Sequence, residues 1–181
     1  MTLERPDFQR LLFRTAFCVM ACNGELHQKE KDEIRGMSKS ASYFKGINLS
    51  AELQELLNDF KERGTHIVEE LFETLTKLDA SIVQELLLLE VAFRVVAADN
   101  EEDEYERKFV RFLRSKLKVH DEVIRDRFGA VDYLFDRDYT QDIVKSETHN
   151  DLFASIAIPE FKDLVTVDFS NFNENREDIN N

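Results

Sequence analysis

The most apolar stretch of the chain covers residues 81–100 and predicts a buried helix. It contains neither Gly nor Pro, and Ser81 is a favourable residue for a helix N-cap. Between residues 86 and 98 only Glu90 and Arg94 interrupt the apolar side chains, and their spacing predicts that they pair on one polar strip. A helix that is apolar almost all round must be surrounded by other helices. The sequence therefore predicts an all-α domain around this central helix.

The chain also contains an internal repeat. Residues 11–34 align with residues 87–110 without a gap, and 8 of the 24 pairs are identical. Each copy is predicted to form a buried helix, a tight acidic turn and an amphipathic helix. Because two copies are fewer than a solenoid requires, the pattern favours an internally duplicated globular domain. Equivalent buried positions are expected at Phe17 and Phe93, at Val19 and Val95, and at Ala21 and Ala97.

Hydrophobic periodicity predicts further helices on both sides of the central one, and six to seven helices before His120. The expected ranges are 6–22, 27–36, 51–63 after a Ser50 cap, 65–79, 104–117 and 121–128. Beyond them, residues 131–135 and 156–158 look partly buried, and the alternation over residues 165–169 indicates a short strand or extended segment. We expect a helical domain over residues 1–119, a mixed or irregular C-terminal extension packed on it over 120–170, and a disordered tail over 171–181.

Composition and charge restrict the classes of function. The 181 residues are 43% hydrophobic and 34% charged, which is typical of a folded protein. The net charge of −13 argues against nucleic acid and anionic membrane surfaces as partners, and favours cations or basic protein surfaces. No segment is apolar enough for membrane insertion, and the first residues do not resemble a signal peptide. Cys18 and Cys22 lie one helical turn apart, which disfavours a disulfide between them. A cytoplasmic location with reduced thiols is expected.

The densest chemical signal is the run over residues 99–106, where six carboxylates occur without a Lys or Arg among them. Crowded carboxylates repel each other unless a positive charge relieves them. Ca²⁺, Mg²⁺ and Mn²⁺ prefer oxygen ligands, so a weak divalent-cation site is one interpretation, and no organic cofactor is expected. The candidate metal ligands are Asp99, Glu101, Asp103 and Glu106 in the second copy and Asn23, Glu25 and Glu30 in the first.

The same residues have a purely structural interpretation. Asp103 and Glu106 have the spacing of a helix capping box, and acidic residues in a first helical turn are favoured by the helix dipole. Caps alone and caps with a weakly bound cation are both open at this point. An EF-hand is excluded, because a loop starting at Asp99 would have Glu104 in place of its Gly and Val110 in place of its final Glu.

The two acidic turns, ACNGELHQKE and AADNEEDEYE, resemble those of the TerB-like (tellurite-resistance) family. The stretch SYFKGINLSAELQELLNDF resembles the middle section of that family, and the likeness covers about residues 8–119. Asn23 stands where an Asp is usual, and Asn100 replaces the Gly of the second turn. The resemblance implies a helical binding module in a stress-response or metal-response system. It also implies protein partners that are membrane-associated or calcium-binding.

Three functions are consistent with these features. The first is a non-catalytic module that binds a divalent cation through its acidic turns, and the second is a structural protein–protein interaction domain whose acidic residues only cap helices. The third, a metal-dependent enzyme, is least favoured, because no nucleophile lies beside a recognisable base and orienting group. If the two copies pack parallel, their turns lie at one end of the domain and can share a site. If they pack antiparallel, the turns lie at opposite ends.

Overall fold

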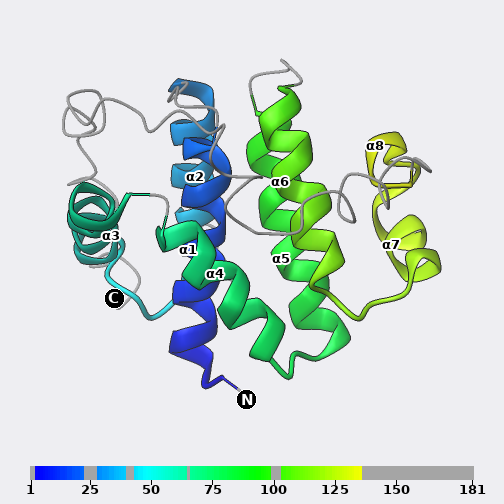
Figure 1. Ribbon diagram of the computed structural model, residues 1–181, viewed down its shortest axis with the longest axis horizontal. Coiled ribbons are helices and arrows are strands. Elements are labelled where there is room, and N and C mark those ends of the chain that lie inside the picture. The colour runs from blue at the N-terminus through cyan, green and yellow to red at the C-terminus, as the bar shows by residue number, and fades with distance from the viewer. Residues whose placement is uncertain (1–2, 23–27, 40–42, 65, 99–102, 136–181) are drawn as a thin grey trace, which may run out of the picture.

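The computed structural model describes residues 3–22, 28–39, 43–64, 66–98 and 103–135, and within these ranges the chain forms helices and no strand. Six helices precede His120 and two short ones follow it (Figure 1). Their bounds are α1 Arg5–Ala21, α2 Gln28–Lys39, α3 Leu49–Arg63, α4 His66–Lys77, α5 Ile82–Val96, α6 Glu104–Ser115, α7 Asp121–Phe128 and α8 Asp132–Phe135. The all-α expectation is confirmed. The predicted extended segment at residues 165–169 lies outside the described residues.

Helices α1 and α5 form the centre of the domain. They pack against each other, α5 also contacts α2 and α6, and α1 also contacts α4 and α6. Both run in the same direction in Figure 1, so their C-terminal ends lie at the same end of the molecule. Helices α2 and α6 begin at that end and run back alongside them. The two copies of the repeat are therefore parallel.

The burial of the repeated positions agrees with the duplication in part. Val19 and Val95 are both fully buried. Phe17 is also buried, whereas Phe93 is only partly buried and Ala97, the counterpart of buried Ala21, is exposed. The expectation of equal burial is therefore wrong at two of the three pairs, because each copy has different neighbours beyond its own helix pair.

Local signals explain most helix ends. Ser81 caps α5 and forms a complete capping box with Gln84. Helix α3 begins earlier than expected, because Asn48 and not Ser50 is its N-cap, accepting a hydrogen bond from the Ala51 N–H at 3.1 Å. Gly129 takes a positive φ of 79° directly after α7, a conformation that glycine adopts without strain. These caps set where the helices start and stop, and so where the turns between them lie.

Helices α7 and α8 cover one side of α5 and α6. The Phe93 ring of α5 makes edge contacts with Phe128 of α7 and Tyr133 of α8, at centroid distances of 5.0 and 6.5 Å. Leu134 is buried, and its neighbours Val131, Tyr133 and Phe135 pack partly buried against the core. The expected partial burial of residues 131–135 is thus confirmed.

The predicted pairing of Glu90 with Arg94 is wrong, since each side chain bonds to another part of the chain. Glu90 accepts hydrogen bonds from the Tyr43 hydroxyl and from Arg127 of α7, the latter at 2.9 Å. Arg94 instead donates to Glu33 of α2 at 2.6 Å and lies over the Tyr43 ring. The polar strip of α5 therefore connects it to α2, α7 and the segment before α3.

Candidate functional site

Two buried carboxylates mark the end of the domain where α1 and α5 stop. Glu30 lies in the first turn of α2 and is 0% exposed, and Glu106 lies in the first turn of α6 and is 1% exposed. They occupy the same position in the two copies of the repeat. Burying a carboxylate is costly unless hydrogen bonds, a helix dipole or a cation compensate the charge. Two equivalent positions that both keep a buried acid therefore point to a specific local role.

Both carboxylates lie near the thiol of Cys22, at the C-terminal end of α1. Burial first, and then the negative charges of Glu106, Asp103 and Glu30, raise the pKa of this thiol well above its ordinary value. The pKa of this one thiol is thus raised by acidic groups from both copies of the repeat. The parallel packing of α1 and α5 is what brings the starts of α2 and α6 to this common point.

Asp103 acts as the N-cap of α6. Its Oδ1 accepts hydrogen bonds from the backbone N–H groups of Tyr105 at 2.6 Å and Glu106 at 3.4 Å. The capping role expected for Asp103 is therefore present. Glu106 differs from the expected capping-box partner, because its side chain is buried in the domain, and a complete box is seen only at α5 among the described helix starts. Capping therefore explains Asp103, whereas the buried Glu106 side chain is held by other interactions within the domain.

The remaining candidates, Asn23, Glu25, Asp99 and Glu101, lie outside the described residues. They belong to the two segments of the sequence that connect α1 to α2 and α5 to α6. Over the part of the chain that the structure describes, no group of three or more His, Cys, Asp and Glu side chains is arranged to hold a metal ion. Glu30, Asp103 and Glu106, three of the seven predicted ligands, therefore all lie close enough to Cys22 to raise its pKa, but they do not form a metal site with one another.

Basic and aromatic groups border Glu106 on the side of α8. The guanidinium of Arg107 lies over the Tyr133 ring, 5.8 Å from its centroid. Burial raises the pKa of Tyr133 to about 12, with Glu106 adding to the shift and Arg107 and Arg111 opposing it. Helix α8 therefore lies close to the buried carboxylate and separates this part of α6 from solvent.

Glu85 is a buried carboxylate that no sequence pattern singled out. It is 3% exposed and accepts hydrogen bonds from the backbone N–H groups of Lys118 at 2.8 Å and Val119 at 2.5 Å. The only sequence signal is an acidic residue just ahead of the leucine run of a buried helix. Its role is structural, since it holds the α6–α7 linker against α5.

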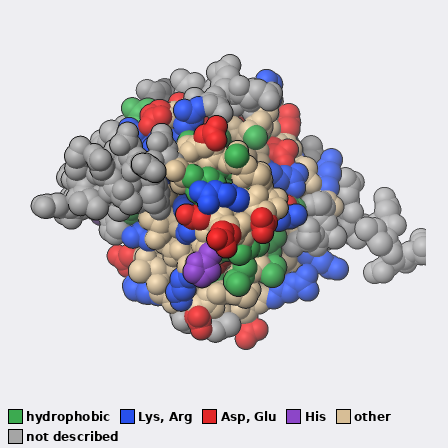
Figure 2. All heavy atoms as spheres, turned by 90° about the vertical axis from the view of Figure 1, so that its right-hand side faces the viewer, with side chains coloured by type: hydrophobic (Ala, Val, Ile, Leu, Met, Phe, Trp, Pro, Cys, Tyr) green, Lys and Arg blue, Asp and Glu red, His purple; other side chains and the backbone are tan. Residues whose placement is uncertain are grey.

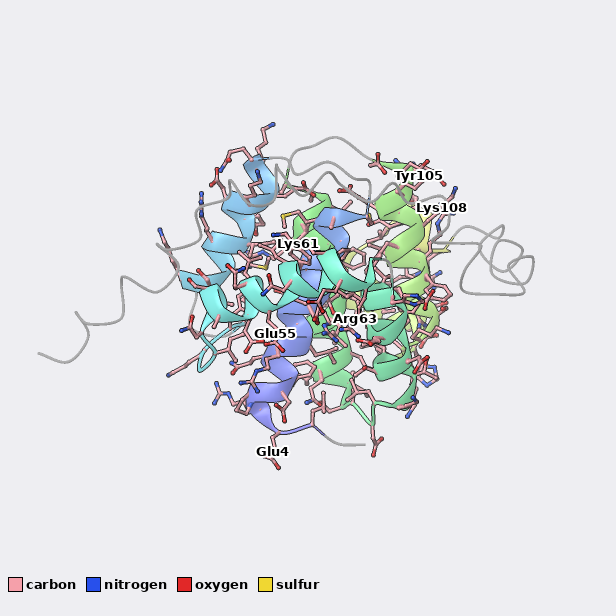
Figure 3. The ribbon with its side chains drawn as sticks, turned by 60° about the vertical axis from the view of Figure 1, so that its left-hand side comes forward. Glu4, Glu55, Lys61, Arg63, Tyr105 and Lys108 are labelled. Carbon is pink, nitrogen blue, oxygen red and sulfur yellow. The ribbon has the colours of Figure 1, made fainter. Side chains whose placement is uncertain are left out.

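A surface groove of about 470 Å³ lies between α1, α3 and α4. Its charged lining residues bond to one another, since Arg10 pairs with Glu52 at 2.6 Å and with Asp7 at 2.9 Å. Figure 3 shows another lining residue, Glu55, on α3, away from the start of α6, where Tyr105 and Lys108 are labelled. The groove is therefore separate from the acidic end of the domain.

Comparison with known proteins identifies a family. The family model described as "Tellurite resistance protein TerB" matches residues 11–126, which is more than half of the chain. Neither the curated proteins nor the solved structures include a significant match. None of the helices in the described ranges is long and apolar enough to cross a membrane. The family match covers both copies of the repeat and all helices from α2 to α6, and the chain therefore belongs to the TerB tellurite-resistance family.

Proposed function

We propose that this chain is a non-catalytic binding module that weakly holds a divalent cation between its two helix–loop–helix units. One observation carries the proposal: Glu30 and Glu106, equivalent in the repeat, are both buried and both lie close to Cys22. Two carboxylates in one low-dielectric region repel each other and lose hydration. A cation between the two copies would reduce this repulsion and add to the partners that both carboxylates already have within the chain.

The available donors favour a hard cation. Carboxylate and amide oxygens suit Ca²⁺, Mg²⁺ or Mn²⁺. The proposed ligands are Glu30 and Glu106, with Asp103 at the edge and with Asn23, Glu25, Asp99 and Glu101 contributed by the two turns.

Membership of the TerB family supports the wider setting that we propose for this site. The module would act in a cytoplasmic stress-response or metal-response system, with protein partners that are membrane-associated or calcium-binding. The net charge of −13 supports partners with basic surfaces and disfavours nucleic acid. Cation binding would alter the charge at one end of the domain, which is a direct way to change the affinity for such a partner.

A second candidate is a structural interaction domain in which the acidic residues serve only the helix starts. The hydrogen bonds of Asp103 to the first turn of α6 favour it. The positive ends of the α2 and α6 dipoles would also stabilise Glu30 and Glu106 without a metal. The two candidates differ in one respect that can be measured, namely whether added cations stabilise the fold.

Thermal unfolding of the full chain with added Ca²⁺, Mg²⁺ or Mn²⁺ separates these candidates. A bound cation stabilises the native state by about 2.7 kcal/mol at a hundred times its dissociation constant. The double variant Glu30→Gln with Glu106→Gln should lose most of that gain. Glu85→Gln is the matched control, because it removes a buried carboxylate elsewhere in the domain and should keep the gain. A parent melting temperature that none of the three ions raises at millimolar concentration favours the interaction domain.

A further inference from the structure

The first two turns of α5 expose an apolar surface. Ile82 is 56% exposed and Val83 is 67% exposed, although α5 is otherwise one of the two central helices. Leu86 and Leu87 lie one turn further on and are partly exposed. Residues four apart are neighbours on a helix surface, so these four side chains are contiguous. We call them the α5 patch.

The described helices cover α5 beyond this patch but leave the patch open. Phe93, further along α5, is covered by Phe128 of α7 and Tyr133 of α8. The α6–α7 linker is held on α5 by the two hydrogen bonds that Glu85 accepts from Lys118 and Val119. Figure 2 views the molecule from the side of α7 and α8 and shows hydrophobic side chains gathered between charged ones on this face. Isolated exposed apolar residues are ordinary, but a group of four beside a covered face is suited to a binding partner.

Basic residues border the α5 patch. The Lys118 side chain is 70% exposed and lies 3.9 Å from Asp79, just before α5 begins. Arg127 of α7 is 57% exposed and bonds to Glu90 of α5. The occupant of this surface should therefore be apolar and acidic.

We propose that the α5 patch is the docking site of the chain's own C-terminal segment, residues 136–181. This segment contains eleven Asp or Glu and four Lys or Arg, and it has apolar positions over residues 156–158 and 165–169. It follows Phe135, whose ring lies 4.0 Å from the Arg125 guanidinium on α7, so it starts on the basic side of the domain. Thirty residues can span about 100 Å when extended, so the tether is long enough. The inference is independent of the proposed cation site.

The test places a photo-crosslinking amino acid at Val83 of the full chain and identifies the products by mass spectrometry. The expected product is a crosslink within one chain, from position 83 to a peptide of the 136–181 segment. The same amino acid at Lys77, an exposed position on α4, is the control and should not give this product. A crosslink between two copies of the chain, or none to residues 136–181, would overturn the proposal.

A proteolysis experiment tests the same docking without a crosslinker. Replacing Ile82 and Val83 by Ser in the full chain should speed tryptic cleavage at Lys145 and Lys162 at least several-fold, because the segment loses its apolar anchor. Tyr105→Ser is the matched control, since Tyr105 is also exposed but lies at the start of α6. Equal cleavage rates in the parent and both variants, with unchanged melting temperatures, would contradict the docking.

Discussion

Replacing Glu85 by Ala tests how the α6–α7 linker is held on the central helix. The carboxylate is buried and accepts two backbone hydrogen bonds, from Lys118 and Val119. Hydrogen bonds to a charged group are worth about 1.5–3 kcal/mol each, and a buried donor left without its acceptor costs about as much. Val119 is buried, so water cannot replace the lost acceptor of its N–H group, whereas the N–H group of exposed Lys118 can bond to water. We expect a total loss of about 3–4 kcal/mol, chiefly from Val119.

Denaturant unfolding of the full chain gives this loss directly, provided that the slope m is unchanged. Glu85→Gln keeps an acceptor oxygen without the charge and should lose only about 1–2 kcal/mol. Glu73→Ala removes an exposed carboxylate that pairs with Lys77 and should change stability by less than about 0.5 kcal/mol. A loss below about 1 kcal/mol for Glu85→Ala, or equal losses for Ala and Gln, would refute the reasoning.

Three further predictions concern the core and its titratable groups. Phe93→Ala should cost about 2–3 kcal/mol in denaturant unfolding, less than the roughly 3–5 kcal/mol expected for fully buried Phe17→Ala, and equal losses would contradict the difference in their burial. Burial raises the pKa of Cys18 to about 12 and the pKa of Cys22 well above its ordinary value. Alkylation of either thiol at about pH 8 should therefore require unfolding, and rapid labelling of the native chain would contradict this. Burial acts to raise the pKa of Glu90, but bonds from Tyr43 and Arg127 outweigh it and lower the pKa below 4.5. The stability that ionised Glu90 contributes should therefore be complete above pH 4.5 and be lost as the pH falls through the lowered pKa of the folded state. The difference in unfolding free energy between the parent and Glu90→Gln should accordingly shrink below pH 4.5.

Features that depend on neighbouring residues in the chain could be predicted from the sequence. The central helix, its Ser81 cap and the Asp103 cap follow from apolar spacing and from side chains that bond to backbone two or three residues away. The repeat likewise predicted a second helix equivalent to α5, and α1 is indeed central. Each of these signals is contained in a short stretch of sequence.

Features set by tertiary packing could not be predicted in the same way. Glu90 and Arg94 have the spacing of a pair on α5, but Tyr43, Arg127 and Glu33 come from other elements and compete for their bonds. The direction in which the two copies pack depends on the whole domain, so the meeting of Glu30 and Glu106 near Cys22 emerged only from the structure. Glu106 likewise has the spacing of a capping-box residue, but tertiary packing buries its side chain in the domain and no capping box forms at α6.

Isothermal titration of the full chain with Ca²⁺, Mg²⁺ and Mn²⁺ tests the central claim most directly. If the two copies share one site, at least one of these ions should bind with a stoichiometry of one per chain. Binding should be lost in the double variant Glu30→Gln with Glu106→Gln and kept in Glu85→Gln. Two cations per chain would contradict the shared site, and no binding heat together with no melting shift for any of the three ions would contradict cation binding altogether.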